Sequence, residues 1–154
     1  MCIRDSCCTS VHLPPPEAWA ERAAAVLAAG TVGVVADTVV ARWLTPAGAA
    51  RAPETLAWLR AMLVATPPEG YAGCCGAIEH VDLRDDLASI SAPALVIAGA
   101  EDPATPLPHL ERIAEGIDGA RLELLAGAAH LANVERPDVV TRLIAEHCAP
   151  EPAR

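Results

Sequence analysis

A short apolar run in the second half of the sequence places the strongest constraint on the fold. Residues 94–98 are all apolar, and they lie between Pro93 and Gly99. A run of this length without polar alternation is typical of a strand that is buried on both faces of a parallel sheet. The patterns after it predict a helix, a strand and a second helix over about residues 106–117, 121–125 and 135–148. This alternation of strand and helix predicts an open α/β sheet.

The first half of the chain has a helical pattern instead. Apolar residues recur at helical spacing, and proline or glycine lies at the boundaries of the segments. The helices are predicted over about residues 16–30, 32–44, 53–66 and 71–80. In this interpretation Pro46 and the pair Pro67-Pro68 end helices. The first half is therefore expected to form a helical layer.

The predicted strands are too few for a complete sheet. Sheets normally hold about five or more strands, whereas this chain supplies two clear strands and a remnant near Cys7. We therefore interpret it as the C-terminal part of a larger α/β protein whose N-terminal strands are missing. The expected divisions are a leader that is not native and has neither strand nor helix pattern (1–6), a strand remnant with its linker (7–13), the helical layer (14–70), the C-terminal part of the core (71–148) and a tail (149–154).

Charge and hydropathy exclude several classes of function. Eleven basic residues against twenty acidic ones give a net charge of −9, which disfavours a nucleic-acid partner. No apolar run approaches the ~18 residues that cross a bilayer, and no signal-peptide pattern begins the chain, so we expect no membrane partner. The histidines show no metal-ligand spacing. No C-x-x-C occurs among the cysteines, which we expect to be reduced thiols in a cytoplasmic protein: Cys2, Cys7, Cys8, Cys74, Cys75 and Cys148.

One polar residue follows each predicted strand of the α/β part. Asp102 lies in the loop after residues 94–98, and His130 lies in the loop after residues 121–125. Open α/β sheets place their active sites at the carboxyl ends of the strands, so these two side chains can meet there. The carboxylate would accept the Nδ1–H of the imidazole and leave Nε2 as a general base. The order acid, then histidine, is that of the triad of α/β hydrolases. Taken singly, each residue also fits a structural role.

The nucleophile of such a triad is absent from the sequence. None of the four serines, Ser6, Ser10, Ser89 and Ser91, lies in the G-x-S-x-G turn that exposes a serine hydroxyl. The thiols of Cys74 and Cys75 lie in a predicted helix without such a turn. We therefore expect this chain alone to be inactive.

Six segments carry a more specific resemblance: residues 42–45, 70–78, 82–84, 92–99, 101–106 and 128–137. Together they resemble the 3-oxoadipate enol-lactonases, an α/β-hydrolase family of the β-ketoadipate pathway of aromatic catabolism. The acid and histidine loops alone would fit many α/β hydrolases, whereas residues 42–45 and 70–78 narrow the resemblance to this family. It extends from about Cys7 to His147.

The resemblance implies a reaction and roles for individual residues. Asp102 is implied to be the triad acid and His130 the general base, and the helical layer is implied to be a cap that lines the substrate pocket. Trp19 and Trp43 are implied to pack on the lactone ring, although packing within the cap explains each of them equally well. The implied reaction is attack of a serine, absent here, on the lactone carbonyl, followed by hydrolysis to 3-oxoadipate without a metal or an organic cofactor.

Other interpretations of the same residues stay open. The chain could belong to another capped α/β hydrolase, such as an esterase or a carbon–carbon bond hydrolase, or it could be a non-catalytic fragment. The expected partner is a small-molecule lactone. Some relatives are fused to a carboxymuconolactone decarboxylase domain, so such a domain could follow Arg154.

Overall fold

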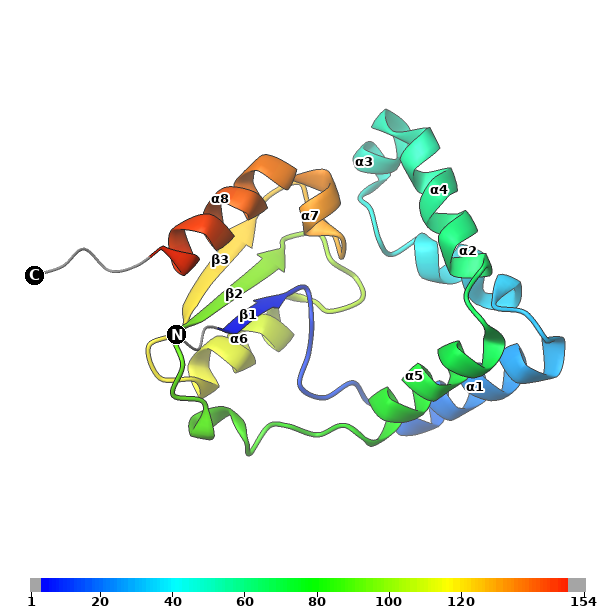
Figure 1. Ribbon diagram of the computed structural model, residues 1–154, viewed down its shortest axis with the longest axis horizontal. Coiled ribbons are helices and arrows are strands. Elements are labelled where there is room, and N and C mark those ends of the chain that lie inside the picture. The colour runs from blue at the N-terminus through cyan, green and yellow to red at the C-terminus, as the bar shows by residue number, and fades with distance from the viewer. Residues whose placement is uncertain (1–3, 150–154) are drawn as a thin grey trace, which may run out of the picture. The chain divides into compact units, whose positions relative to one another are not determined.

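Two units make up the computed structural model, which describes residues 4–149 (Figure 1). The α/β unit comprises residues 4–10 and 86–149, and the helical unit comprises Val11–Asp85. The helical unit is thus inserted in the chain between the first and second strands of the α/β unit.

A parallel sheet forms the centre of the α/β unit. Over the described residues it holds three strands in the order β1 (Arg4–Cys7), β2 (Ala94–Gly99) and β3 (Arg121–Leu125). In the register, Leu95 pairs with Asp5 of β1 and with Arg121 of β3. Every residue of the middle strand is buried, as its continuous apolar run predicts. The carboxyl ends of β2 and β3 therefore lie at the same edge of the sheet.

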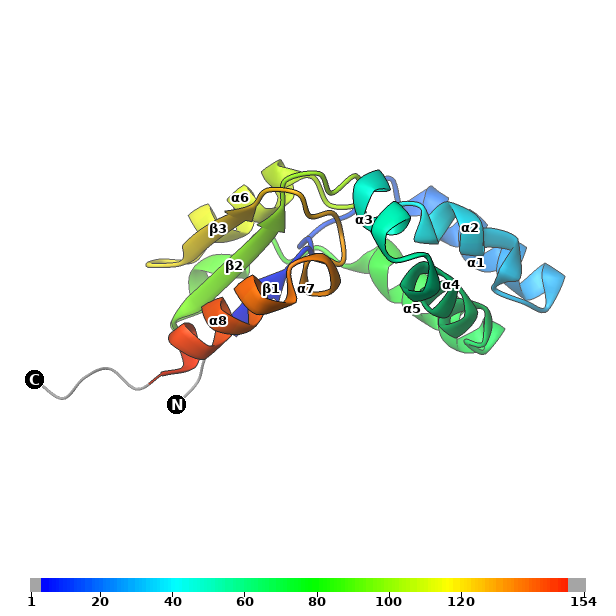
Figure 2. The same cartoon turned by 90° about the horizontal axis from the view of Figure 1, so that it is seen from above.

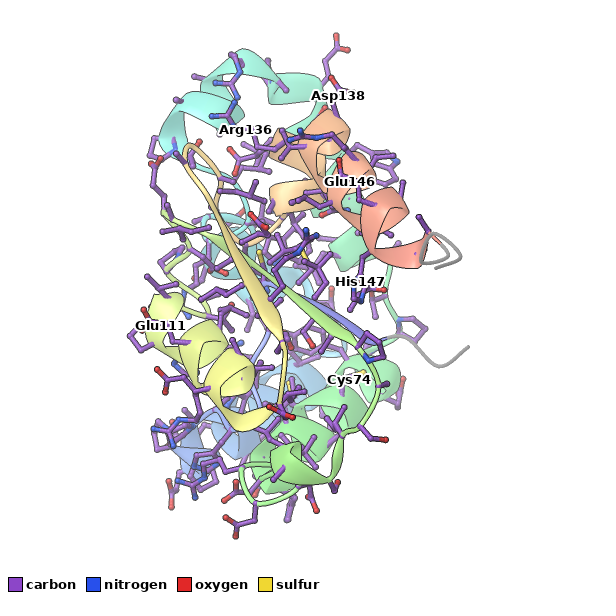
Figure 3. All side chains as sticks on the ribbon, turned by 90° about the vertical axis from the view of Figure 1, so that its left-hand side faces the viewer. Cys74, Glu111, Arg136, Asp138, Glu146 and His147 are labelled. Carbon is purple, nitrogen blue, oxygen red and sulfur yellow. The ribbon has the colours of Figure 1, made fainter. Side chains whose placement is uncertain are left out.

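Helices cover both faces of this sheet. The helix α6 (Leu107–Gly116) lies on one side and α8 (Pro137–Cys148) on the other (Figure 2). Figure 3 shows Glu111 of α6 and Glu146 of α8 on opposite sides of the strands. On the α8 side the core is formed by side chains of the middle strand, β3 and α8, among them Leu95, Ile97, Leu125, Val140 and Leu143. The remaining elements are a 3₁₀ turn, Leu87–Ser89, and the short helix α7, Ala132–Glu135.

The strand β1 corrects the interpretation of the N-terminus. Residues 4–6 belong to a strand that ends at Cys7, so the prediction that residues 1–6 form no strand is wrong for these residues. The physical reason is that backbone groups, which every residue carries, make the pairing with β2. Residues 1–3, and all of the expected tail except Ala149, lie outside the described residues.

Five helices form the helical unit within the described residues: α1 (Pro16–Ala29), α2 (Gly33–Val40), α3 (Pro46–Arg51), α4 (Pro53–Val64) and α5 (Pro68–His80). Their core contains Val26, Val32, Ala36, Val40 and Leu63. The first helix ends at the predicted residue, because Gly30 adopts a φ of 65° and donates its N–H to the Leu27 carbonyl. The unit runs to Asp85, beyond the boundary expected at residue 70, because α5 packs against α1.

Proline explains the helix boundaries that differ from the predictions. Pro46 and Pro68 were predicted to end helices, but each is the first residue of one, where a missing N–H costs nothing. The helix α3 was therefore missed. The helix predicted over residues 135–148 is α8, which begins two residues later because Pro137 is its first residue, and the short helix α7 before it was not predicted.

No helix in the part of the chain that the structure describes is long and apolar enough to span a membrane.

Candidate active site

The loop after β2 holds the carboxylate of Asp102 in a fixed orientation. The side chain of Asp102 has no solvent exposure. Its Oδ1 accepts backbone N–H groups from Ala104 at 2.7 Å and from Thr105 at 3.1 Å. Its Oδ2 accepts the hydroxyl of Thr105 at 2.7 Å. These bonds form because an Asp side chain readily accepts backbone donors two and three residues ahead in a turn.

The loop after β3 is held by the residues that follow it. Gly127 turns the chain with a φ of 66°. The N–H of Ala129, next to His130, donates to Glu135 Oε2 at 2.7 Å. Arg136, which lies at the start of α8 in Figure 3, donates from Nε and Nη2 to the carbonyl of Ala126 at 3.1 and 2.7 Å. Both sides of the loop that carries His130 are therefore tied to the α7–α8 segment.

The two loops bring Asp102 and His130 together. Nδ1 of His130 lies 2.9 Å from Oδ2 of Asp102. The imidazole is about a quarter exposed, whereas the carboxylate is buried. In this arrangement Nδ1–H donates to the carboxylate, and Nε2 is the atom that can take a proton from another group. The structure thus joins the two residues that the sequence singles out.

Electrostatics favours the charged form of both groups. Burial raises the pKa of Asp102, but hydrogen bonds from His130 and Thr105 outweigh it, and the pKa lies below its ordinary value. Burial lowers the pKa of His130, but the hydrogen bond and the charge of Asp102, with a smaller effect of Cys8, bring it above its ordinary value. The pair is suited to stabilise an imidazolium that forms during a reaction.

This pair makes the stability of the chain depend on pH in two directions. The contribution of Asp102, whose folded pKa lies below 3.8, is present above pH 3.8 and is lost as the pH falls through the folded pKa. The contribution of His130, whose folded pKa lies above 6.5, is present below pH 6.5 and is lost as the pH rises through the folded pKa. We therefore expect His130→Gln to lower the free energy of unfolding most between pH 3.8 and 6.5. Urea unfolding of the variant and of the unsubstituted chain at a series of pH values measures this difference.

The control for this measurement is Asp37→Asn in the helical unit. Asp37 pairs with Arg60 at 2.6 Å on the surface, and Arg60 does not titrate in the range tested. The effect of Asp37→Asn should therefore be constant through neutral pH. An effect of His130→Gln that is equally constant would contradict the ion pair.

Gly99, the last residue of β2, lets the histidine loop approach the strand. A Cβ built on Gly99 would lie 2.7 Å from the carbonyl oxygen of Ala128 and 3.0 Å from the carbonyl carbon of the same residue. Backbone hydrogen bonds join the same segments, from Ala100 N–H to the Leu125 carbonyl and from Glu101 N–H to the Ala128 carbonyl, both at 3.0 Å. The close packing of the two loops therefore depends on the absence of a side chain at position 99.

Gly99→Ala should displace the histidine loop. The clash involves backbone atoms, which cannot rotate away as a flexible side chain can, so we expect a loss of about 1–3 kcal/mol in the free energy of unfolding. Urea unfolding measures this loss, and the NMR signals of His130 should shift as well. Gly76→Ala is the control, because Gly76 lies within α5 and a Cβ there would meet nothing within 4 Å. Equal stability of the two variants would contradict the close approach.

Trp19 and Trp43, two of the three tryptophans, have contacts within the helical unit. Trp19 donates its Nε1–H to the carbonyl of Leu13 at 2.8 Å, and Arg22 lies 4.7 Å from the centre of its ring. Trp43 is half-buried and packs against the core of the unit. Their proposed contact with the substrate stays a prediction.

Ser10 and Ser89 form hydrogen bonds with residues outside the Asp102–His130 pair. Ser10 Oγ lies 2.7 Å from Nδ1 of His109, a histidine of α6, and Ser89 donates to the carbonyl of Asp86. Cys74 is exposed and Cys75 is buried, both within α5. Among residues 4–149 no group of three or more His, Cys, Asp or Glu side chains could hold a metal ion.

Sequence reasoning missed three residues beside the pair. Thr105 and Glu135 are described above, and the third is Cys8, which follows β1 with a φ of 46° and has its Sγ 3.5 Å from the Ala129 carbonyl. The Sγ atoms of Cys7 and Cys8 lie 4.0 Å apart, and this contact lowers the pKa of Cys8 to about 7. The spacing of Thr105 three residues after Asp102 is a signal that could have identified it, because hydroxyl residues commonly bond within such turns.

Comparison with known proteins gives enol-lactonases and other hydrolases. No protein-family model matches the chain. The chain is 37% identical over 136 residues to 3-oxoadipate enol-lactonase 2 of Acinetobacter baylyi. The aligned residues make up 88% of this chain and 50% of that protein. A hydrolase from Pseudomonas aeruginosa is 40% identical with a TM-score of 0.88, covering 96% of this chain and 55% of that one. The enol-lactonase from Burkholderia xenovorans is 36% identical with a TM-score of 0.89, covering 94% and 55%. The chain spans about half the length of the curated relatives it matches.

Proposed function

We propose that the chain takes part in the hydrolysis of 3-oxoadipate enol-lactone to 3-oxoadipate. It shares the fold of α/β hydrolases, as its sequence predicts, and is similar to 3-oxoadipate enol-lactonases. The observation that supports this most is the 2.9 Å contact between His130 Nδ1 and Asp102 Oδ2 at the ends of adjacent strands. An acid and a base held in this way suit acyl transfer from an ester or lactone.

In the proposed mechanism Nε2 of His130 takes the proton of a serine hydroxyl. This serine belongs to a segment of the protein outside the 154 residues. Its oxygen attacks the lactone carbonyl, the ring C–O bond breaks, and the proton on Nε2 passes to the oxygen that leaves. A water molecule then gives one proton to Nε2 and attacks the acyl carbon, which releases the enol form of 3-oxoadipate and returns the proton to the serine. The released enol tautomerises to 3-oxoadipate. Asp102 stabilises the imidazolium in both steps.

The proposal places this reaction in the cytoplasm. All five cysteines among the described residues are free thiols, and three of them are exposed: Cys7, Cys74 and Cys148. Exposed unpaired thiols suit a reducing compartment.

The test begins with the genomic DNA upstream of the codon for Cys7. We expect an open reading frame that encodes a strand followed by G-x-S-x-G. The whole protein is then expressed and assayed for turnover of the enol-lactone and of simple aryl esters. Faster turnover of the enol-lactone supports the proposal. Turnover of aryl esters alone would move the assignment to an esterase, and a reading frame without the serine turn would overturn catalysis.

A further inference from the structure

The hydroxyl of Thr105 takes part in the contact between Asp102 and His130. Thr105 is only 3% exposed, and its Oγ1 lies 2.7 Å from Asp102 Oδ2 and 3.4 Å from His130 Nδ1. We propose that Thr105 is a positioning residue that fixes the carboxylate of Asp102 against the imidazole and limits the basicity of His130. This deepens the proposed function, since it rests on His130 as the base.

The carboxylate of Asp102 is fully bonded because of Thr105. Its oxygens accept four hydrogen bonds, from Ala104 N–H and Thr105 N–H at Oδ1 and from the Thr105 hydroxyl and His130 at Oδ2. A carboxylate offers about four lone-pair sites. Thr105 makes two of the four bonds, one to each oxygen, and so prevents rotation of the group about its Cβ–Cγ bond.

The hydroxyl also supports the Nδ1–H tautomer that Asp102 imposes on the imidazole. A hydroxyl has one proton, and the shorter distance assigns it to Oδ2 of Asp102. The side of Oγ1 that faces Nδ1 of His130 is therefore a lone pair. Two acceptors, Oδ2 and Oγ1, then face Nδ1, so the neutral imidazole carries its proton there. Nε2 is left deprotonated, as a general base requires.

The same hydrogen bond weakens the pull of Asp102 on the histidine proton. A donor to Oδ2 stabilises its negative charge, so less of that charge acts on the imidazolium. In the α/β unit, the titratable groups whose charges act on His130 are Asp102, in the loop after β2, and Cys8, after β1. Without the hydroxyl, Asp102 would hold the proton on His130 more tightly and make it a poorer proton acceptor at neutral pH.

The test is NMR titration of the histidine ¹⁵N signals in the 154-residue chain and in two variants. Thr105→Val keeps the shape and removes the hydroxyl, and Thr105→Ser keeps the hydroxyl. We expect Thr105→Val to raise the pKa of His130 by about 0.5–1 unit, while the neutral ring keeps its proton on Nδ1, which Asp102 Oδ2 still accepts. Thr105→Ser should restore the pKa of the unsubstituted chain. An unchanged pKa in Thr105→Val, or a pKa in Thr105→Ser that is raised as much as in Thr105→Val, would overturn the proposal.

A second measurement covers the case in which Thr105→Val does not fold. In the unsubstituted chain, the hydroxyl proton of Thr105 should exchange slowly with water, because it is buried and bonded to a carboxylate. Rapid exchange would overturn the proposal. Neither readout involves a substrate. A protein without lactonase activity can therefore still support the role of Thr105. Conversely, an active lactonase in which Thr105→Val leaves the pKa of His130 unchanged would refute that role.

Discussion

Replacing His130 with alanine in the whole, active protein should lower kcat for lactone hydrolysis by about 10⁴–10⁶-fold, because the proposed general base that takes the proton of the nucleophile is lost. KM should change little, since the imidazole acts mainly on the transition state. Steady-state kinetics on the enol-lactone measures both constants. Circular dichroism and urea unfolding confirm that the variant is folded.

The matched control for His130→Ala is His109→Ala. His109 is a half-buried histidine of the same unit, bonded to Ser10 at 2.7 Å. It lies outside the Asp102–His130 pair, so its loss should leave kcat within a few-fold of the unsubstituted protein. Equal losses in the two variants would show that His130 contributes through stability alone and would remove it from the proposed mechanism.

Asp102→Asn should lower kcat by about 10⁴-fold while the fold persists. The asparagine amide has nearly the size of the carboxylate, but its NH₂ group can face Nδ1 of His130 and donate to it. The neutral imidazole then carries its proton on Nε2, where it cannot accept one from a nucleophile. Kinetics at neutral pH measures the loss, and histidine NMR measures the change of tautomer.

Glu101→Gln is the control for this substitution, since Glu101 is the exposed carboxylate next to Asp102 in the same loop. It should leave kcat nearly unchanged. A loss of less than tenfold in Asp102→Asn would mean that Asp102 is a turn residue, the structural role that its sequence context also allows.

The elements that were predicted correctly depend on local chemistry. The strand β3 has the predicted bounds, Arg121–Leu125, because Gly119 turns the chain just before it with a φ of 70°. The buried strand β2 is recognisable because its apolar residues lack the alternation of a half-exposed strand. The joint position of Asp102 and His130 follows from the geometry of parallel strands, which the order of elements already implies.

The elements that were missed depend on contacts between distant parts of the chain. The strand β1 forms through its pairing with β2, about ninety positions later in the register, and its own residues carry no strand pattern. Nothing around Glu135 indicates that its carboxylate accepts the N–H of Ala129. Pro46 and Pro68 were ambiguous because proline suits both the end of one helix and the start of the next.

The two ends of the helical unit are joined to each other in a short stem, formed by residues 11–12 and 82–83. At its two ends the Leu83 N–H donates to the Val11 carbonyl at 3.0 Å, and His12 pairs with Asp82 in an antiparallel bridge. An insertion whose ends are joined in this way can be replaced by another segment whose ends lie equally close together, whatever its length. Natural recombination or a designer could therefore exchange the whole helical insertion as a cassette between hydrolases. The acid–base pair, which lies entirely outside this cassette in the chain, would be inherited unaltered.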